Sequence, residues 1–267
     1  MPTHKYITSS NFLVLLFFVA YLQGQIKTQY FESFDETNIA YTDEGNGDAV
    51  LLIHGFINTK ESWGKTELKT DLLAEGFRVV TVDLRGNGES DKPQEVDAYA
   101  LNAEVMDIMF LMQELRVRKY MAVGYSRGSI ILAKLLTKDK RIKKAVLGGM
   151  GIDFTLPYWK RKMMFIKAFG GEVTEETKEA VDYAKSVNAD FPSLHLQQKY
   201  QPVTTKRELS YIKAKILVVA GDKDLGNGSP QKLHEAIPKS KLKIVTGGHN
   251  GTAKTKAFSE AVVSFLD

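Results

Sequence analysis

Cysteine is absent from this chain of 267 residues, and its absence removes two kinds of chemistry. No disulfide can cross-link the fold, and no thiolate can act as a catalytic nucleophile. The sequence also lacks an excess of charge of one sign, because 36 lysines and arginines face 32 aspartates and glutamates spread along the chain. A balance of this kind argues against nucleic acid as the partner.

Long apolar runs are lacking too. The run from Phe12 to Leu22 is too short to span a bilayer, and it follows a weakly basic start. A short apolar core after such a start is typical of a signal peptide, so we predict one over residues 1–24. The alternatives are an uncleaved anchor or a buried strand. We expect an exported chain, periplasmic or extracellular, with no stable membrane insertion after signal removal. Export without disulfides favours a bacterial periplasm.

The remaining residues, 25–267, suit one large α/β domain, with no internal repeat or low-complexity tract. After an opening hairpin, short apolar runs alternate with segments of helical spacing. This alternation predicts a mostly parallel eight-stranded sheet with helices on both faces. The strands are expected at residues 30–34, 39–42, 49–53, 77–82, 120–123, 144–148, 216–220 and 242–245. The helices are expected at 65–75, 98–115, 129–136, 175–186, 229–236 and 255–266.

One segment, at about residues 151–209, is too long to be a loop. We predict that it forms a small helical cap over the carboxyl edge of the sheet, with an irregular stretch at 188–202. Its aromatic residues Tyr158 and Trp159 are candidates for a substrate pocket, and simple packing explains them equally well. The basic run from Lys160 to Lys162 is expected to be a solvated face rather than an anion site.

The pentapeptide Gly124 to Gly128 lies between a predicted buried strand and a predicted apolar helix. A Gly-x-Ser-x-Gly in that context is typical of a nucleophile elbow, a turn so tight that side chains at both glycine positions would collide. Ser126 would then present its hydroxyl outward. The alternative is an ordinary strand-to-helix turn in which serine caps the helix.

A serine nucleophile needs a base, and the base needs an orienting acid. In a sheet of this kind such groups lie at the carboxyl ends of the strands. Asp222 and Asp224 follow one late strand, and His249 follows the next. The chain order of serine, aspartate and histidine is the order found on folds with a nucleophile elbow.

The chain resembles the α/β-hydrolase superfamily, specifically its small cap-bearing esterase and perhydrolase-like members, from about Tyr30 to the C-terminus. Any one of four short signatures would be weak evidence, but all four follow one another in order at the ends of predicted strands. They are His54-Gly55-Phe56, Asp83 to Ser90, Gly124 to Gly128, and Gly221 to Asp224 with His249.

The resemblance implies a catalytic triad. Ser126 is the implied nucleophile and His249 the general base, and the family pattern places the acid at Asp224. Asp222 is expected to support the loop instead. Asp153 is the other alternative, because some relatives take their acid after the sixth strand.

The resemblance also implies an oxyanion hole made by the backbone N–H groups of Phe56 and Arg127. Trp63 and Tyr125 are candidates for the substrate pocket, with packing as the alternative for Trp63. A guanidinium after the nucleophile is unusual in this family. It would favour an acidic or polar substrate, or pair with a carboxylate of the cap.

Three other groups of residues are expected to have structural roles. His54 should be a hydrogen-bonding histidine, while Asp83 and Arg85 should brace the loops around the site. His195 lies in the predicted cap and is a weaker candidate for substrate contact. No cluster of His, Asp and Glu has metal-ligand spacing, and a Gly-x-Gly-x-x-Gly nucleotide motif is missing after the first buried strand. We therefore expect neither a metal nor a cofactor.

The sequence thus predicts a serine hydrolase that cleaves a carboxylic ester or related acyl bond of a small molecule. One alternative is a cofactor-free perhydrolase of the haloperoxidase type. Another is a ligand-binding protein on the same fold, since a fold does not guarantee a function. Haloalkane dehalogenases and epoxide hydrolases are excluded on the family pattern, because they need an aspartate where this chain has Ser126. The sequence does not indicate an oligomeric state.

Overall fold

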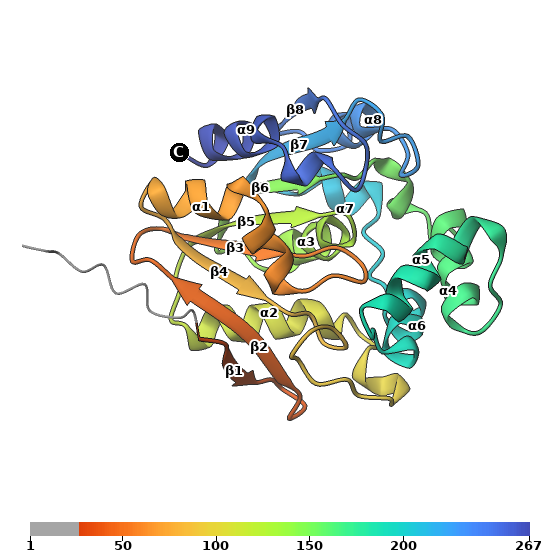
Figure 1. Cartoon of the computed structure of the whole chain (residues 1–267). Coiled ribbons are helices and arrows are strands. Elements are labelled where there is room, and N and C mark those ends of the chain that lie inside the picture. The colour runs from red at the N-terminus through yellow and green to blue at the C-terminus, as the bar shows by residue number, and fades with distance from the viewer. Residues whose placement is uncertain (1–26) are drawn as a thin grey trace, which may run out of the picture.

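A computed structural model describes residues 27–267, so the predicted signal peptide lies outside the described residues. The chain forms one eight-stranded sheet with the order β1-β2-β4-β3-β5-β6-β7-β8 (Figure 1). The first two strands pair antiparallel, as do β2 and β4, and every later pairing is parallel. The strands are β1 (Gln29–Glu32), β2 (Asn38–Glu44), β3 (Ala49–Ile53), β4 (Arg78–Val82), β5 (Tyr120–Tyr125), β6 (Ile142–Gly148), β7 (Lys215–Gly221) and β8 (Ser240–Val245). The predicted eight-stranded, mostly parallel sheet is therefore confirmed.

The central strands are buried along their whole length. Every residue of β3 and of β5 is buried, as expected for strands covered on both faces. The edge strand β8 differs, because Lys241 and Lys243 lie on it and most of its residues are exposed or partly exposed. Charged side chains on an edge strand discourage pairing with another chain.

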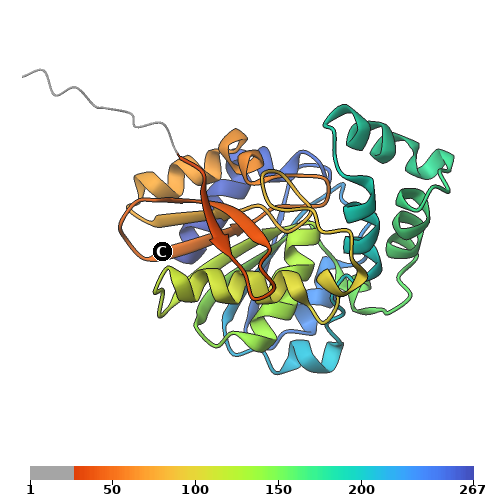
Figure 2. The ribbon, with the colours of Figure 1, turned by 90° about the horizontal axis from the view of Figure 1, so that it is seen from below.

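Helices cover both faces of the sheet, and each face has its own apolar core. One core packs Leu51 and Ile53 against α2 (Ala103–Glu114), α3 (Arg127–Lys138) and α8 (Pro230–Glu235). The other packs Val50 and Leu52 against α1 (Glu67–Ala74) and α9 (Lys256–Leu266). Figure 2 shows α1 in orange on the opposite side of the strands from α2 and α3. Alternate residues of a strand point to opposite faces, so both faces of β3 must be apolar.

Four helices lie between β6 and β7: α4 (Lys160–Phe169), α5 (Glu175–Ser186), α6 (Phe191–Lys199) and α7 (Lys206–Ser210). We call α4 to α6 the helical insert. Figure 1 shows the insert beyond the carboxyl ends of the parallel strands. None of the helices in residues 27–267 is long and apolar enough to cross a membrane.

The prediction of an irregular stretch at 188–202 is wrong, because α6 occupies most of it. Asp190 caps this helix by accepting a hydrogen bond from the Ser193 N–H at 2.9 Å. Pro192 lies in the first helical turn, where the missing N–H costs nothing because no intrahelical acceptor exists there. Proline thus begins this helix rather than interrupting it.

The basic run at the start of α4 is not a uniformly solvated face. Lys160 is exposed and Arg161 is half-buried, but Lys162 is only 8% exposed. The sequence-based expectation is therefore wrong for Lys162, which lies on the same buried helix face as Phe165 and Phe169.

Candidate active site

The turn between β5 and α3 has the geometry of a nucleophile elbow. Ser126 has backbone angles φ 54° and ψ −122°, a region that residues other than glycine rarely occupy. A Cβ added at Gly124 would lie 2.4 Å from the Gly128 oxygen, and one at Gly128 would lie 2.2 Å from the Ile53 oxygen. Both positions therefore require glycine, for the steric reason that the sequence motif indicates.

Three side chains at this edge of the sheet form one hydrogen-bonded chain. The Ser126 Oγ lies 2.8 Å from His249 Nε2, and His249 Nδ1 lies 2.8 Å from Asp224 Oδ2. They follow β5, β8 and β7, respectively. Asp224 is buried, whereas His249 is partly exposed. The structure therefore brings together the three residues predicted as a triad.

The two alternative acids do not contact His249. Asp222 Oδ1 accepts a hydrogen bond from the Gly247 N–H at 2.9 Å, so it ties the loop after β7 to the loop after β8. Asp153 lies against the backbone of Gly228, where an added Cβ would be 2.4 Å from its carboxyl carbon. Of the three aspartates, Asp224 is the one in position to orient the imidazole.

Asn227 is a member of this site that the sequence did not indicate. Its side chain is buried, and its Nδ2 donates a hydrogen bond of 3.1 Å to Asp224 Oδ1. The same Nδ2 lies 3.0 Å from His249 Nδ1. Asp224 thus has one oxygen on the histidine and the other on Asn227, which fixes the plane of the carboxylate.

The loop after β3 lies beside the serine. A Cβ on Gly55 would lie 3.3 Å from the Ser126 Cβ, so glycine lets the two backbones approach. The Phe56 N–H donates to no acceptor within residues 27–267, and the Arg127 N–H is the first of α3 and has no intrahelical acceptor. Two backbone donors are thus available for an oxyanion.

His54 fixes the base of this loop. Its Nε2 accepts a hydrogen bond from the Leu84 N–H at 3.1 Å, and its Nδ1 lies 2.7 Å from the Gly55 oxygen. Burial lowers the pKa of His54, in keeping with a neutral ring that accepts at Nε2 and donates at Nδ1. The structural role predicted for His54 is confirmed by these contacts.

The guanidinium of Arg127 is not free to bind a substrate. It forms two hydrogen bonds with Glu104 of α2, at 2.7 and 2.6 Å, and a third with the Gln197 oxygen of α6, at 2.9 Å. The expected alternatives were an acidic substrate or a carboxylate of the insert. Instead, the partner carboxylate comes from α2, and the insert supplies a carbonyl.

Asp83 and Arg85 brace the loop after β4, as predicted. Asp83 accepts hydrogen bonds from the backbone N–H groups of Lys60 and Glu89, at 2.6 and 2.9 Å. Arg85 forms two hydrogen bonds with buried Asp107, at 2.7 and 2.6 Å. Burial raises the pKa of Asp107, although the Arg85 charge opposes the rise.

The carboxylates of Glu61, Asp83 and Glu89 lie close enough together to share a cation. The Lys60 ammonium already bridges them, at 2.6, 3.0 and 2.5 Å, respectively. Burial would lower the pKa of Lys60, but its bonds to these carboxylates raise it above its ordinary value. An ammonium therefore fills the position that a metal ion would take.

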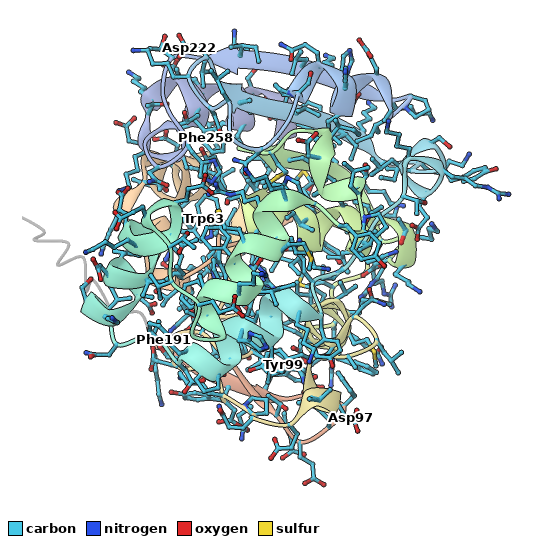
Figure 3. The ribbon with its side chains drawn as sticks, turned by 90° about the vertical axis from the view of Figure 1, so that its right-hand side faces the viewer. Trp63, Asp97, Tyr99, Phe191, Asp222 and Phe258 are labelled. Atoms are coloured by element: carbon cyan, nitrogen blue, oxygen red, sulfur yellow. The ribbon has the colours of Figure 1, made fainter. Side chains whose placement is uncertain are left out.

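Two of the predicted pocket residues pack inside the main domain. Trp63 is buried in the core beneath α1 and α9. Tyr125 packs edge-on against Phe258, and its hydroxyl donates to the His249 oxygen at 2.7 Å. Burial raises the pKa of Tyr125, which keeps that hydroxyl protonated. Figure 3, which faces the insert, labels Phe258 and Trp63 between Asp222 at the top and Phe191 lower down.

The other two predicted pocket residues, Tyr158 and Trp159, line a hollow of about 500 Å³. Tyr158 is largely exposed there and Trp159 is mostly buried. The hollow also reaches Arg161 and Gly226, next to Asn227 in sequence. His195 does not line it; its Nδ1 lies 2.9 Å from the Ile166 oxygen and ties α6 to α4.

Phenylalanines of the insert meet the oxyanion loop, a feature that the sequence did not single out. The ring of Phe56 lies 5.6 Å from that of Phe165 and 5.2 Å from that of Phe169, between centroids. Phe191 extends the cluster, 5.3 Å from Phe169. These rings join the insert to the loop that carries the predicted oxyanion donor Phe56.

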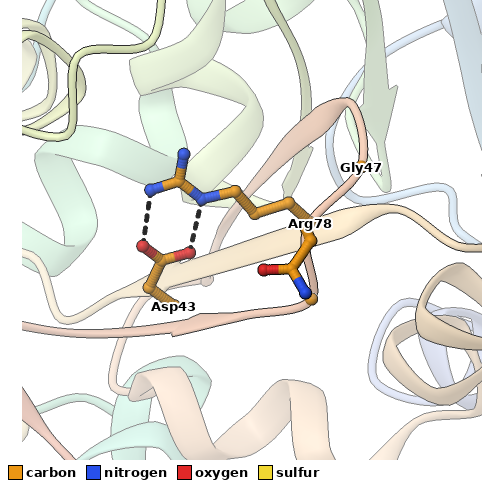
Figure 4. A pocket seen from close by; sticks show the side chains of 5 residues that line it. Asp43, Gly47 and Arg78 are labelled. Carbon is orange, nitrogen blue, oxygen red and sulfur yellow. Dashed lines mark hydrogen bonds and ion pairs between the residues drawn. The ribbon is translucent and has the colours of Figure 1, made fainter.

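A second hollow, of about 310 Å³, lies at the opposite edge of the sheet, where β3 and β4 begin (Figure 4). Its one guanidinium, Arg78, forms two hydrogen bonds with Asp43, at 2.7 and 2.6 Å. The hollow is therefore remote from the triad, and its cation is already paired.

Comparison with known proteins agrees with this geometry. A family model described as alpha/beta hydrolase fold matches residues 48–165. A putative non-heme chloroperoxidase from Synechocystis sp. is 38% identical over 112 residues, which cover 41% of this chain and 39% of that protein. Bifunctional epoxide hydrolase 2 from Sus scrofa is 33% identical over 93 residues, covering 34% and 16%, respectively. These alignments span less than half the length of each relative.

Solved structures match over nearly the whole chain. An esterase from Exiguobacterium antarcticum superposes with a TM-score of 0.75 at 23% identity, covering 90% of this chain and 99% of that one. A bromoperoxidase from Bacillus anthracis gives a TM-score of 0.70 at 23% identity, with the same coverage. The chain therefore has the α/β-hydrolase fold, and its residues 48–165 match the family model of that description.

The strained backbone of Ser126 predicts that glycine is more stable than alanine at this position. We expect Ser126→Gly to be more stable than Ser126→Ala by about 1 kcal/mol, because both lose the bond to His249 but only glycine accepts φ 54° without strain. Urea unfolding measures the difference. The control is the same pair of substitutions at Ser186, in the last position of α5, where alanine should be the more stable. Equal stability of the two Ser126 variants would contradict strain at the elbow.

Proposed function

We propose that this chain is a serine hydrolase that cleaves a carboxylic ester of a small molecule and needs no cofactor. The observation that carries the proposal is the continuous hydrogen-bonded chain from Asp224 through His249 to Ser126, with both links at 2.8 Å. Such a chain activates a hydroxyl that would otherwise be a weak nucleophile at neutral pH.

The first half-reaction forms an acyl-enzyme. Ser126 Oγ attacks the ester carbonyl while His249 Nε2 takes the hydroxyl proton. The oxyanion of the tetrahedral intermediate accepts hydrogen bonds from the N–H groups of Phe56 and Arg127. The intermediate collapses as the C–O bond to the alcohol breaks, and His249 gives its proton to the departing oxygen. Asp224 holds the imidazole in one orientation and stabilises its charged form.

The second half-reaction reverses these roles with water. His249 removes a proton from a water molecule, which attacks the acyl carbonyl and forms a second tetrahedral intermediate. Its collapse breaks the bond to Ser126 Oγ, which recovers the proton from His249 and releases the carboxylic acid. The insert phenylalanines near Phe56 limit the access of bulk water to the acyl group.

Perhydrolysis is a second candidate, favoured by the chloroperoxidase and bromoperoxidase among the similar proteins. Hydrogen peroxide would replace water in the second half-reaction and release a peracid instead of an acid, with Ser126 regenerated in the same way. Adding peroxide to the esterase assay and titrating the peracid distinguishes the two outcomes. A binding role without catalysis is disfavoured, because a binding protein has no need of an oriented serine–histidine–aspartate chain.

The proposal predicts that wild-type protein hydrolyses p-nitrophenyl esters in a series from acetate to palmitate. Ser126→Ala should lower kcat by about 10⁴-fold or more, because it removes the nucleophile. The control is Ser186→Ala, an exposed serine on α5, which should retain wild-type rates. Equal turnover by wild type and Ser126→Ala would show that Ser126 is not the nucleophile. If folded wild type cleaves no ester, with or without peroxide, the proposed function is wrong.

Asn227 should act on the rate through Asp224. We expect Asn227→Ala to lower kcat by about 10–100-fold with little change in KM, because a hydrogen bond to a charged carboxylate is lost. Asn227→Ser, which keeps a donor, should recover part of the rate. Asn46→Ala, in the exposed turn at the opposite edge, is the control. A change confined to thermal stability, with kcat intact, would contradict this positioning role.

A further inference from the structure

Five lysine and arginine side chains of residues 27–267 are at most 8% exposed, and four of them are ion-paired. Each of the four has at least one carboxylate oxygen within 3.0 Å of a charged nitrogen. The pairs are Lys60 with Asp83, Arg85 with Asp107, Arg127 with Glu104, and Lys134 with Glu208. The fifth is Lys162 of α4, and no carboxylate of the described residues lies within 4 Å of its ammonium.

Most of the Lys162 side chain is buried, yet its ammonium nitrogen, which has no hydrogen-bond partner among the described residues, stays in contact with solvent. Burial and the nearby positive charge of Arg127 both lower the pKa of Lys162. Glu104, the carboxylate that binds this neighbouring Arg127, already accepts hydrogen bonds from it at both oxygens. The chain therefore keeps a cation at a position that its own side chains do not neutralise.

Lys162 belongs to the helix of the insert whose phenylalanines pack on the oxyanion loop. It lies on the face of α4 that also carries Phe165 and Phe169, and both of those rings contact Phe56 of the oxyanion loop. Its charged neighbour Arg127 directly follows Ser126. Lys162 thus lies at the junction of the insert and the elbow.

A second cation flanks the same phenylalanine. The guanidinium of Arg161 lies over the Phe165 ring, 5.0 Å from its centroid, and lines the 500 Å³ hollow. It has no carboxylate within 4 Å among the described residues, although the more distant charge of Asp224 favours its protonated form. Arg161 and Lys162, neighbours on α4, thus both lack a carboxylate within 4 Å among the described residues, although Asp153 and Glu176 also line the hollow beside Arg161.

We propose that Lys162 is an anion-binding subsite and that the preferred substrate carries a free carboxylate beyond the reacting ester, as a monoester of a dicarboxylic acid does. The proposal rests on the proposed hydrolase function and adds the substrate class. One ammonium on the helix face that also carries Phe165 and Phe169 matches one singly charged carboxylate at the end of an alkyl chain. A phosphate dianion would require more donors than Lys162 supplies.

The test compares two esters that differ only in this charge, p-nitrophenyl hydrogen adipate and p-nitrophenyl hexanoate. Wild type should prefer the adipate in kcat/KM by about tenfold or more. Lys162→Met should lose about 30-fold or more on the adipate and stay within about threefold on the hexanoate. Lys167→Met, on the same helix, exposed and outside the 500 Å³ hollow, should behave as wild type. Equal losses on both esters would overturn the subsite.

Stability gives an independent readout. Removing a charge that makes no ion pair should leave the Tm of Lys162→Met unchanged or slightly higher, whereas removing a structural ammonium would lower it. Lys162→Gln, which keeps a polar end, replaces the methionine variant if that one does not fold. A fall in Tm for both variants would contradict the proposal.

Binding without turnover separates this proposal from the proposed function. Adipate should raise the Tm of Ser126→Ala but not that of Ser126→Ala with Lys162→Met. If wild type cleaves no ester and adipate still stabilises only the first of these proteins, the hydrolase proposal fails and the anion subsite stands. If neutral esters are cleaved while adipate neither stabilises nor reacts faster, the subsite fails and the hydrolase stands.

Discussion

The steric constraint at the elbow decides the arrangement of this edge of the sheet. The chain must leave β5 and enter α3 at one residue, Ser126, whose backbone is strained. That turn is possible because Gly124 and Gly128 present no Cβ to each other or to the end of β3. The close approach of β3 in turn brings the loop with Gly55 and Phe56 beside the serine. Nucleophile and oxyanion donors are thus positioned by one packing requirement.

Buried ion pairs hold the loops around that turn. Arg127 joins the elbow helix to α2 through Glu104 and to the insert through Gln197. Arg85 and Asp83 brace the loop after β4. That loop contacts the insert, because the Gln197 side chain donates a hydrogen bond of 2.8 Å to the Arg85 oxygen. Buried pairs of this kind add little net stability, yet removing one partner leaves a costly buried charge. Their effect is to fix loop geometry. Lys162 differs from these cations because it has no carboxylate partner among the described residues.

The sheet and the three residues of the hydrogen-bonded chain could be predicted from local patterns. The apolar run at residues 49–53 predicts a strand buried on both faces, and the elbow glycines have a steric meaning that the sequence carries by itself. The rule that catalytic groups lie at carboxyl strand ends indicates His249 and either Asp222 or Asp224, and the resemblance to the α/β-hydrolases decides for Asp224. The predicted signal peptide over residues 1–24 lies outside the described residues and stays a prediction.

Features that depend on contacts between distant segments could not be predicted. Asn227 gives no signal in a loop already rich in small and polar residues, because its role comes from the fold of that loop onto Asp224. In the sequence, Lys162 belongs to a basic run that predicts an exposed face. Its burial results from docking of α4 onto the oxyanion loop. In the sequence, Pro192 indicates an interruption of helical structure. The cap from Asp190 shows instead that Pro192 lies in the first turn of a helix. The partner of Arg127 likewise comes from a helix 23 residues away in sequence.

The central claim is that the fold activates one particular hydroxyl. The most direct measurement is the reaction of the intact protein with a fluorophosphonate, followed by peptide mass spectrometry to locate the adduct. The account predicts a single phosphonylated residue, Ser126, and loss of labelling in His249→Ala, which removes the base. Absence of any adduct on folded protein, or an adduct on a different residue, would contradict it.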